Sequence, residues 1–105
     1  MNLFEALFAH DPSSIAIEFG ERKISYGELR AETLRMVELV KSHGVNRGDR
    51  VALLLHDSPE FVEAFVAIIS LGAIAVPINM ALRTEEQRSI LENSGASVTF
   101  KEGDF

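Results

Sequence analysis

The sequence lacks cysteine and the common glycine loops that bind phosphate. Without cysteine the chain can form no disulfide bond, no thiolate metal site and no cysteine nucleophile. None of its 7 glycines belongs to a Gly-x-Gly pair, and none is followed by Lys-Ser or Lys-Thr. This excludes the loops in which backbone N–H groups cradle nucleotide phosphates, so we expect the glycines to end helices and open turns.

Positive charge is scarce as well. The chain has 10 Lys and Arg against 16 Asp and Glu, which gives a net charge of −6. We therefore expect no nucleic-acid partner, because non-specific binding to nucleic acids requires basic side chains that neutralise phosphates. The 105 residues, 47% of them hydrophobic and 25% charged, are typical of one globular domain.

The sequence also has no hydrophobic run suited to a membrane. Residues 64–78 are nearly all apolar, but this stretch is shorter than the roughly 20 residues that span a bilayer. Gly72 and Pro77 also interrupt it, so a buried helix followed by a buried strand is the better interpretation. Residues 1–7 have no basic flank, and we therefore expect no secretory signal and a cytoplasmic location.

The first residues predict a short helix followed by a hairpin. Residues 2–10 carry apolar side chains at helical spacing, with Asn2 as the N-cap. Residues 14–19 and 22–25 read as two strands of an antiparallel β-hairpin. Three apolar residues of the first strand are expected to share its inner face: Ile15, Ile17 and Phe19.

A long helix is predicted after the hairpin. Ser25 and Glu28 have the spacing of a capping box, and Gly44 is suited to the left-handed conformation that ends a helix. One face of this helix has apolar spacing and is expected to be buried: Leu29, Thr33, Met36, Val37 and Val40.

The remainder predicts three strands that alternate with two helices. Residues 50–55 and 73–78 are apolar without alternation, which is typical of strands buried on both faces, and residues 97–100 supply a third strand. The first helix has Ser58 as its N-cap and ends at Gly72.

The second of these helices is expected to begin with a capping box. Thr84 and Gln87 have the required spacing, and Ile90 and Leu91 are expected to supply the apolar contact of the helix. Crossovers of this length imply parallel strands with right-handed connections. The predicted fold class is therefore α/β: a βαβαβ unit with a short parallel sheet flanked by helices, plus an N-terminal helix and an antiparallel β-hairpin.

The candidate small-molecule site is the loop His56–Ser58. It follows a buried strand, at the edge where ligands gather in open parallel sheets, and it leads into a helix N-terminus. The alternative, which the residues favour, is that Asp57 and Ser58 only cap that helix. His10 and His43 have no partner at metal-ligand spacing and fall near predicted helix C-termini, so we expect no metal site.

Several glutamates raise the question of paired catalytic carboxylates: Glu60, Glu63, Glu85, Glu86 and Glu92. General acid–base catalysis needs a carboxyl group with a raised pKa in a cleft. These residues are instead expected on solvent faces or in first helical turns, where they complement the helix dipole. Ser25 has no His–Asp support, and no catalytic residue is expected. Arg83 is the candidate anion contact, with a plain surface role as the alternative.

Four elements occur in an order that resembles the AMP-forming adenylate enzyme superfamily, which includes the acyl-CoA synthetases. Residues 24–29 (Ile-Ser-Tyr-Gly-Glu-Leu) are similar to its Leu-Thr-Tyr-x-Glu-Leu element, and residues 48–53 to its Gly-Asp-x-Val-Ala strand. Residues 58–61 match its Ser-Pro-Glu-Phe helix start, and residues 71–79 its Gly-Ala-x-x-x-Pro-Leu/Ile-Asn/Asp strand. Each element is weak alone, but together and in order they are specific.

The resemblance implies that residues 1–105 are the N-terminal portion of the large domain of an AMP-binding ligase, truncated before its reactive parts. It implies ATP, Mg²⁺ and CoA for a full-length member, and a role in processes such as fatty acid metabolism. The family's phosphate loop, with its lysine, and its other catalytic residues belong to later segments. No catalytic residue therefore carries over, and no cofactor is expected for these residues alone.

One departure from the family pattern concerns CoA. Many CoA ligases read Asn-x-Arg-Leu after the proline strand, and in some of them that arginine meets CoA phosphates. Here Ala81 takes its place, and Arg83 is the candidate substitute two positions on.

Two functions from different classes follow. The first is an inactive scaffold fragment of an acyl-CoA synthetase-like ligase, whose partner is the remainder of that ligase. The second is a free-standing α/β interaction domain. It would self-associate through exposed apolar surface and unpaired strand edges.

Overall fold

The computed structural model describes residues 2–105 and confirms the predicted α/β class. Its elements follow the predicted order: α1 (Leu3–Leu7), β1 (Ile15–Phe19), β2 (Arg22–Ser25), α2 (Tyr26–Ser42), β3 (Arg50–Leu54), α3 (Pro59–Ser70), β4 (Ile74–Pro77), α4 (Thr84–Asn93) and β5 (Val98–Lys101). A two-stranded antiparallel sheet joins β1 to β2, and a parallel three-stranded sheet has the order β4-β3-β5.

The parallel sheet has β3 at its centre. Val51 pairs with Ala75 of β4 on one side and with Val98 of β5 on the other. The side chains of Val51, Ala52 and Leu53 are fully buried, which confirms the prediction of a strand covered on both faces. The same prediction for residues 73–78 is wrong, because β4 lies at the edge of the sheet and Ile74 is 48% exposed.

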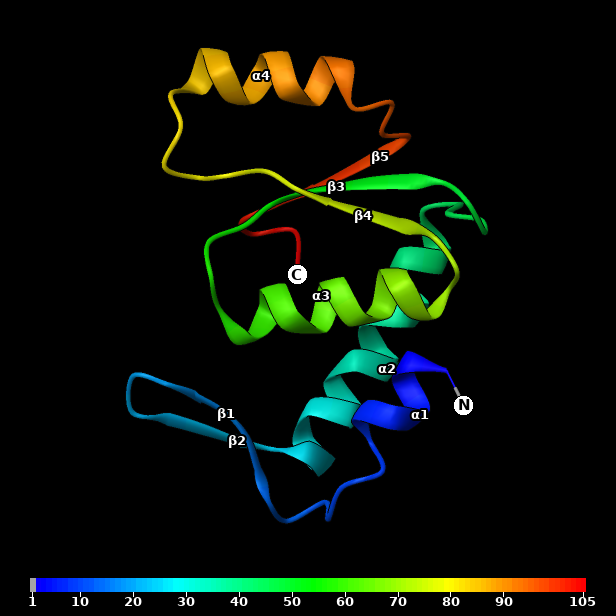
Figure 1. The fold of residues 1–105 in the computed structure, drawn as a ribbon, viewed down its shortest axis with the longest axis vertical. Coiled ribbons are helices and arrows are strands. Elements are labelled where there is room, and N and C mark those ends of the chain that lie inside the picture. The colour runs from blue at the N-terminus through cyan, green and yellow to red at the C-terminus, as the bar shows by residue number, and fades with distance from the viewer. Residues whose placement is uncertain (1) are drawn as a thin grey trace.

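Figure 1 shows the layers of the molecule. The helices α2 and α3 lie on one side of the parallel sheet, α4 crosses the other side, and the hairpin and α1 lie beyond α2. The main core forms between the sheet and α2–α3 from these buried residues: Met36, Val40, Val45, Val51, Leu53, Leu55, Ala64, Ala67, Ile68, Ala73 and Phe100. Because α2 packs along α3, the latter helix is covered by the sheet on one face and by α2 on another.

The predicted caps of α2 are confirmed. The Ser25 hydroxyl accepts a hydrogen bond from the backbone N–H of Glu28 at 3.1 Å and donates to the Glu28 carboxylate at 3.1 Å. Gly44 has φ +77° just beyond the helix, a conformation that glycine adopts without a Cβ clash. The short α1 is capped by Asn2, whose side-chain oxygen accepts from the Glu5 N–H at 2.8 Å.

The hairpin is confirmed as an antiparallel pair, but its apolar face is only partly covered. The register shifts between Ile15 and Ile17, and Ile15 and Phe19 are 46% and 44% exposed. The hairpin extends away from the body of the molecule, so its outer end has little to pack against (Figure 1).

The predicted capping box of α4 is wrong. The Gln87 N–H donates to the Arg83 carbonyl at 3.0 Å, which places Arg83 at the N-cap and Thr84 inside the helix. No side chain of the described residues caps this end. The predicted apolar contact is weak, because Ile90 is 42% exposed and α4 contains no buried residue. Across residues 2–105, no helix combines the length and apolar character needed to cross a bilayer.

Candidate functional site

An open cleft of about 430 Å³ lies at the carboxyl ends of β3 and β4. We call it the strand-end cleft; its lining residues come from the segment after β3, from α3 and from the segment after β4: Leu55, His56, Asp57, Phe61, Pro77, Ile78, Asn79, Met80 and Ala81. The loop predicted as a candidate site therefore does lie beside a cleft, as the strand-end rule leads one to expect. Its second wall, residues 77–81, comes from the neighbouring parallel strand.

His56 is fixed by a residue that follows the third strand. Its backbone N–H donates to Glu102 Oε1 at 2.6 Å, and its Nδ1 lies 3.0 Å from the same oxygen. These hydrogen bonds from His56, the backbone one first, lower the pKa of the Glu102 carboxyl. The pair is exposed to solvent and ties the segment after β3 to the segment after β5.

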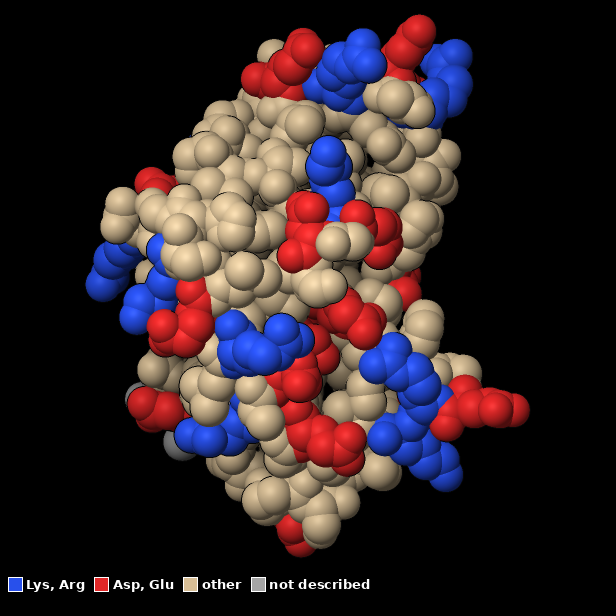
Figure 2. Space-filling view, turned by 180° about the vertical axis from the view of Figure 1, so that it is seen from behind, with Lys and Arg blue, Asp and Glu red and all other residues tan. Residues whose placement is uncertain are grey.

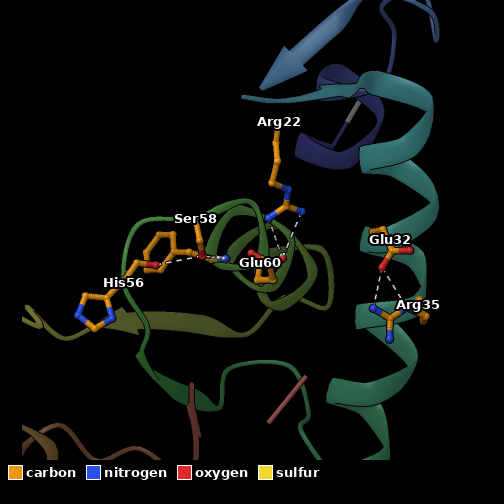
Figure 3. Close-up of polar contacts among 7 residues, drawn as sticks. Arg22, Glu32, Arg35, His56, Ser58 and Glu60 are labelled. Atoms are coloured by element: carbon orange, nitrogen blue, oxygen red, sulfur yellow. Dashed lines mark hydrogen bonds and ion pairs between the residues drawn. The ribbon is translucent and has the colours of Figure 1, made fainter. Parts of the chain in front are cut away.

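Ser58 performs the structural role that the residues favoured. Its hydroxyl accepts from the Phe61 N–H at 3.1 Å and donates to the His56 carbonyl at 3.1 Å (Figure 3). Both bonds organise the first turn of α3, so Ser58 is confirmed as the N-cap.

Arg83 lies apart from the strand-end cleft. Its Nε donates to Glu86 Oε1 at 2.8 Å, and its side chain is 82% exposed. Ala81, which takes the place of the family's arginine, does line the cleft. Among the described residues, the wall that follows β4 therefore contains no cationic side chain.

The side-chain contacts of two residues, which the sequence reasoning did not indicate, shape this wall. The Asn79 side-chain oxygen accepts from the Ala81 N–H at 2.9 Å, which closes an Asx-type turn. The Gln87 side-chain amide lies 3.0 Å from the Leu82 carbonyl and 3.4 Å from the Met80 carbonyl, so α4 holds the preceding loop. An asparagine directly after a strand is a turn signal that could have indicated the first of these contacts.

The other two histidines contact neighbouring rings or carbonyls. His10 stacks on Tyr26 with ring centroids 4.5 Å apart. His43 Nδ1 lies 2.9 Å from the Leu39 carbonyl at the end of α2. Among residues 2–105, no three His, Cys, Asp or Glu side chains are grouped so that they could hold a metal ion.

A second cleft, of about 320 Å³, lies between β2, α2 and α3. We call it the acidic cleft because four of its lining side chains are glutamates: Arg22, Ile24, Glu28, Glu32, Arg35, Met36, Glu60, Glu63 and Phe105 line it. Figure 2 shows acidic side chains running down the middle of the face opposite to that in Figure 1, with basic side chains beside them. Figure 3 shows Arg22 reaching from β2 towards Glu60, and Glu32 beside Arg35 on α2.

Glu63 corrects one sequence expectation. It was expected on a solvent face, but its side chain is buried, with 5% exposure, because α2 packs over this face of α3. Burial, and then the charges of Glu60 and Glu32, raise the pKa of the Glu63 carboxyl to about 7. A raised pKa in a cleft is typical of general acids and bases, but the described residues that line this cleft include no Ser, Thr, Cys or His.

These observations define the class of protein: a layered α/β unit in which a parallel sheet carries a cleft at its strand ends. The family model described as AMP-binding enzyme matches residues 4–104. The chain belongs to this family, and it forms an N-terminal portion of an acyl-CoA ligase-like member.

Relatives with known names support this placement. The chain is 39% identical over 90 residues to the 3-hydroxybenzoate–CoA ligase of Aromatoleum sp. (strain CIB), which covers 86% of this chain and 17% of that protein. It is 42% identical over 84 residues to the crotonobetaine/carnitine–CoA ligase of Salmonella typhimurium. That match covers 80% of this chain and 16% of the ligase. The unliganded o-succinylbenzoate CoA synthetase of Bacillus subtilis superimposes with a TM-score of 0.87 at 33% identity, over 99% of this chain and 23% of that one. The chain thus spans about a sixth of the curated relatives' length.

Proposed function

We propose that this chain is the N-terminal scaffold of an AMP-forming acid–thiol ligase. In that reaction a carboxylate oxygen attacks the α-phosphorus of ATP, with Mg²⁺, and pyrophosphate leaves; the sulfur of CoA then attacks the acyl carbon, and AMP leaves. The observation that carries the proposal is the match of residues 4–104 to the AMP-binding enzyme family. Solved complexes of the Bacillus subtilis synthetase hold ATP with magnesium, an acyl-adenylate and, in a double mutant, the product analogue OSB-NCoA. These complexes support ATP, Mg²⁺ and CoA as the reactants and cofactor of the whole ligase.

The role proposed for these residues is architectural. The buried β3 and the α2–α3 pair form a packed unit against which the rest of the large domain can fold. Residues 1–105 are proposed to belong to that domain, and the ligase to act in the cytoplasm. No residue of the strand-end cleft is assigned a catalytic role, and Arg83, which pairs with Glu86, is assigned no contact with CoA.

The substrate class proposed is a carboxylic acid. The relatives' names cover a hydroxybenzoate and crotonobetaine or carnitine, and a Mycobacterium tuberculosis fatty acyl CoA synthetase is 38% identical over the part of the chain it covers. An aryl acid and a fatty acid therefore both belong in the test, and a role in fatty acid metabolism is one branch of this proposal.

The isolated 105 residues are expected to release no pyrophosphate from ATP. The chain should be incubated with ATP, Mg²⁺ and each of 3-hydroxybenzoate, crotonobetaine and palmitate, beside a full-length ligase in which these residues form the N-terminus. The reason is that the family resemblance places the phosphate loop and its lysine in later segments, and no Gly-Lys-Ser/Thr or Gly-x-Gly loop replaces them here. Acid-dependent pyrophosphate release by the isolated chain would contradict the scaffold role. If the full-length ligase released no pyrophosphate with any of these acids in the presence of ATP, Mg²⁺ and CoA, the ligase assignment would be contradicted.

A second candidate function, self-association, is favoured by the edge strand β4. Ile74 is 48% exposed there, and Ile90 of α4 is 42% exposed. An edge strand with unpaired backbone groups and exposed apolar side chains is a template for pairing with another chain. We propose that two copies meet along the β4 edge.

The isolated chain is expected to elute as a dimer or larger species in light scattering coupled to gel filtration. Ile74→Lys should shift it to a monomer, because a charge on an edge strand opposes strand pairing. Ile15→Lys is the matched control: Ile15 is 46% exposed on the hairpin, and its replacement should leave the assembly intact. A monomer at high concentration for the unmodified chain would rule out this function.

A further inference from the structure

Among residues 2–105, Glu63 is the one glutamate of the acidic cleft that has no hydrogen-bond or ion-pair partner. The two arginines are already engaged: Arg22 Nη1 lies 3.4 Å from Glu60 Oε1, and Arg35 Nη2 lies 2.6 Å from Glu32 Oε2. Glu28 accepts a hydrogen bond from the Ser25 hydroxyl. None of the hydrogen bonds or ion pairs within residues 2–105 involves the Glu63 carboxylate.

Glu63 is largely, though not fully, shielded from water, and this makes the missing partner significant. The Glu63 side chain is only 5% exposed, yet it lines the acidic cleft. An ionised carboxylate that is removed from water is costly unless a cation or hydrogen-bond donors compensate it. The nearby charges of Glu60 and Glu32 add repulsion that outweighs the attraction of the already paired Arg35 and Arg22, which leaves a deficit of positive charge around Glu63.

The walls of the acidic cleft suit an organic cation rather than a metal ion. No three potential metal ligands in the described part of the chain are grouped at metal-binding geometry. Ile24, Met36 and Phe105 supply apolar surface beside the carboxylates, and such surface accommodates the methylene stem of a long basic side chain. A volume of about 320 Å³ is at the lower end of the range for small-ligand pockets.

A guanidinium fits these demands better than an ammonium. It is planar and more weakly hydrated, so it loses less when it leaves water, and its fork of N–H donors matches carboxylate geometry. It also stacks on aromatic faces, and Phe105 is a cleft residue. We propose that the acidic cleft binds the guanidinium group of an arginine side chain, with Glu63 as its counter-ion.

Binding of the guanidinium group to the acidic cleft should depend on pH. The charged groups that face Glu63 are Glu60 on its own helix, Glu28, Glu32 and Arg35 on α2, and Arg22 on β2. The cation requires ionised Glu63, whose pKa in the free protein is about 7. Binding should therefore be about tenfold tighter at about pH 8 than at about pH 6, and should release about half a proton at about pH 7.

The test uses N-acetyl-L-arginine amide as the probe and N-acetyl-L-citrulline amide as its uncharged isostere. Both are titrated into the 105-residue chain and followed by backbone amide NMR shifts and calorimetry in two buffers of different ionisation enthalpy. We expect the arginine probe to bind at least tenfold more tightly than the citrulline probe, with shifts at the residues of the acidic cleft and with release of protons. Equal affinity of the two probes, or binding without proton release, would overturn the proposal.

Variants locate the counter-ion. Glu63→Gln should weaken the arginine probe at least tenfold at about pH 8 and remove the pH dependence, because an amide has no charge to offer. Glu92→Gln, an exposed change on α4, should leave both unchanged. The amide spectrum of each variant confirms that it is folded, and the proton release of the unmodified chain tests the proposal without any variant. Unchanged binding by folded Glu63→Gln would refute the assignment.

Discussion

Replacing Phe100 with alanine is expected to lower the free energy of unfolding by about 3–5 kcal/mol, a large share of the roughly 5–15 kcal/mol that holds a domain folded. Phe100 is on β5, next to the central strand, and is 1% exposed. Its ring centroid lies 5.0 Å from that of His43 and 5.2 Å from that of Phe105. The deletion leaves a cavity between β5 and the helices, and the surrounding rings can fill it only in part.

Urea unfolding followed by circular dichroism measures this loss. Phe19→Ala is the matched control, because it removes the same ring from a side chain that is 44% exposed on the hairpin. We expect that change to cost well under about 1 kcal/mol, as is usual for exposed positions. A similar cost for the two variants would mean that the core between the sheet and α2–α3 is not the main source of stability.

The sequence predicts best those features that depend on neighbours along the chain. Ser25 and Ser58 cap their helices as expected, because each cap needs only an N–H two or three residues ahead. Thr84 fails as a cap although Thr84 and Gln87 have the same capping-box spacing as Ser25 and Glu28. The side chain of Gln87, which a capping box would turn back to the helix start, instead reaches the carbonyls of the preceding loop.

Features that depend on tertiary order were harder to predict. Nothing local distinguishes an edge strand from a central one, so β4 was expected to be buried like β3, although Ile74 is 48% exposed. The order β4-β3-β5 also brings Glu102 to His56, a contact across 46 positions of sequence that no motif indicates. The loop His56–Ser58 does border a cleft at a strand end, but the sequence did not indicate that residues 77–81 form its second wall.

Glu63 is the clearest case of this limit, because a glutamate in a mostly apolar helix looks like a solvent-facing residue. Only the packing of α2 onto α3 buries it. The same packing has a consequence for stability. The pKa of Glu63 is raised to about 7 in the folded protein, above the usual value of 4.5 for a glutamate. As pH rises, the unfolded chain loses this proton first, so higher pH favours unfolding between these two values.

Glu63→Gln is therefore expected to stabilise the protein at about pH 8 by about 2–3 kcal/mol, because ionising a carboxyl group whose pKa is raised to about 7 costs the folded state free energy of this order. At about pH 4 both side chains are uncharged and the two proteins should have similar stability. Thermal unfolding across this pH range provides the measurement, with a gain of roughly 4–8 °C for each kcal/mol in a domain of this size.

Glu92→Gln is the control for the loss of a glutamate charge in a helix, and we expect it to change stability little at either pH because Glu92 is exposed. The arginine probe should act in the opposite sense to Glu63→Gln: it should stabilise the unmodified protein most at about pH 8, where Glu63 is charged, and leave the variant unaffected. If the stability of the unmodified chain did not fall between about pH 4.5 and pH 7 relative to Glu63→Gln, the carboxyl group would not be desolvated as the packing of α2 against α3 requires.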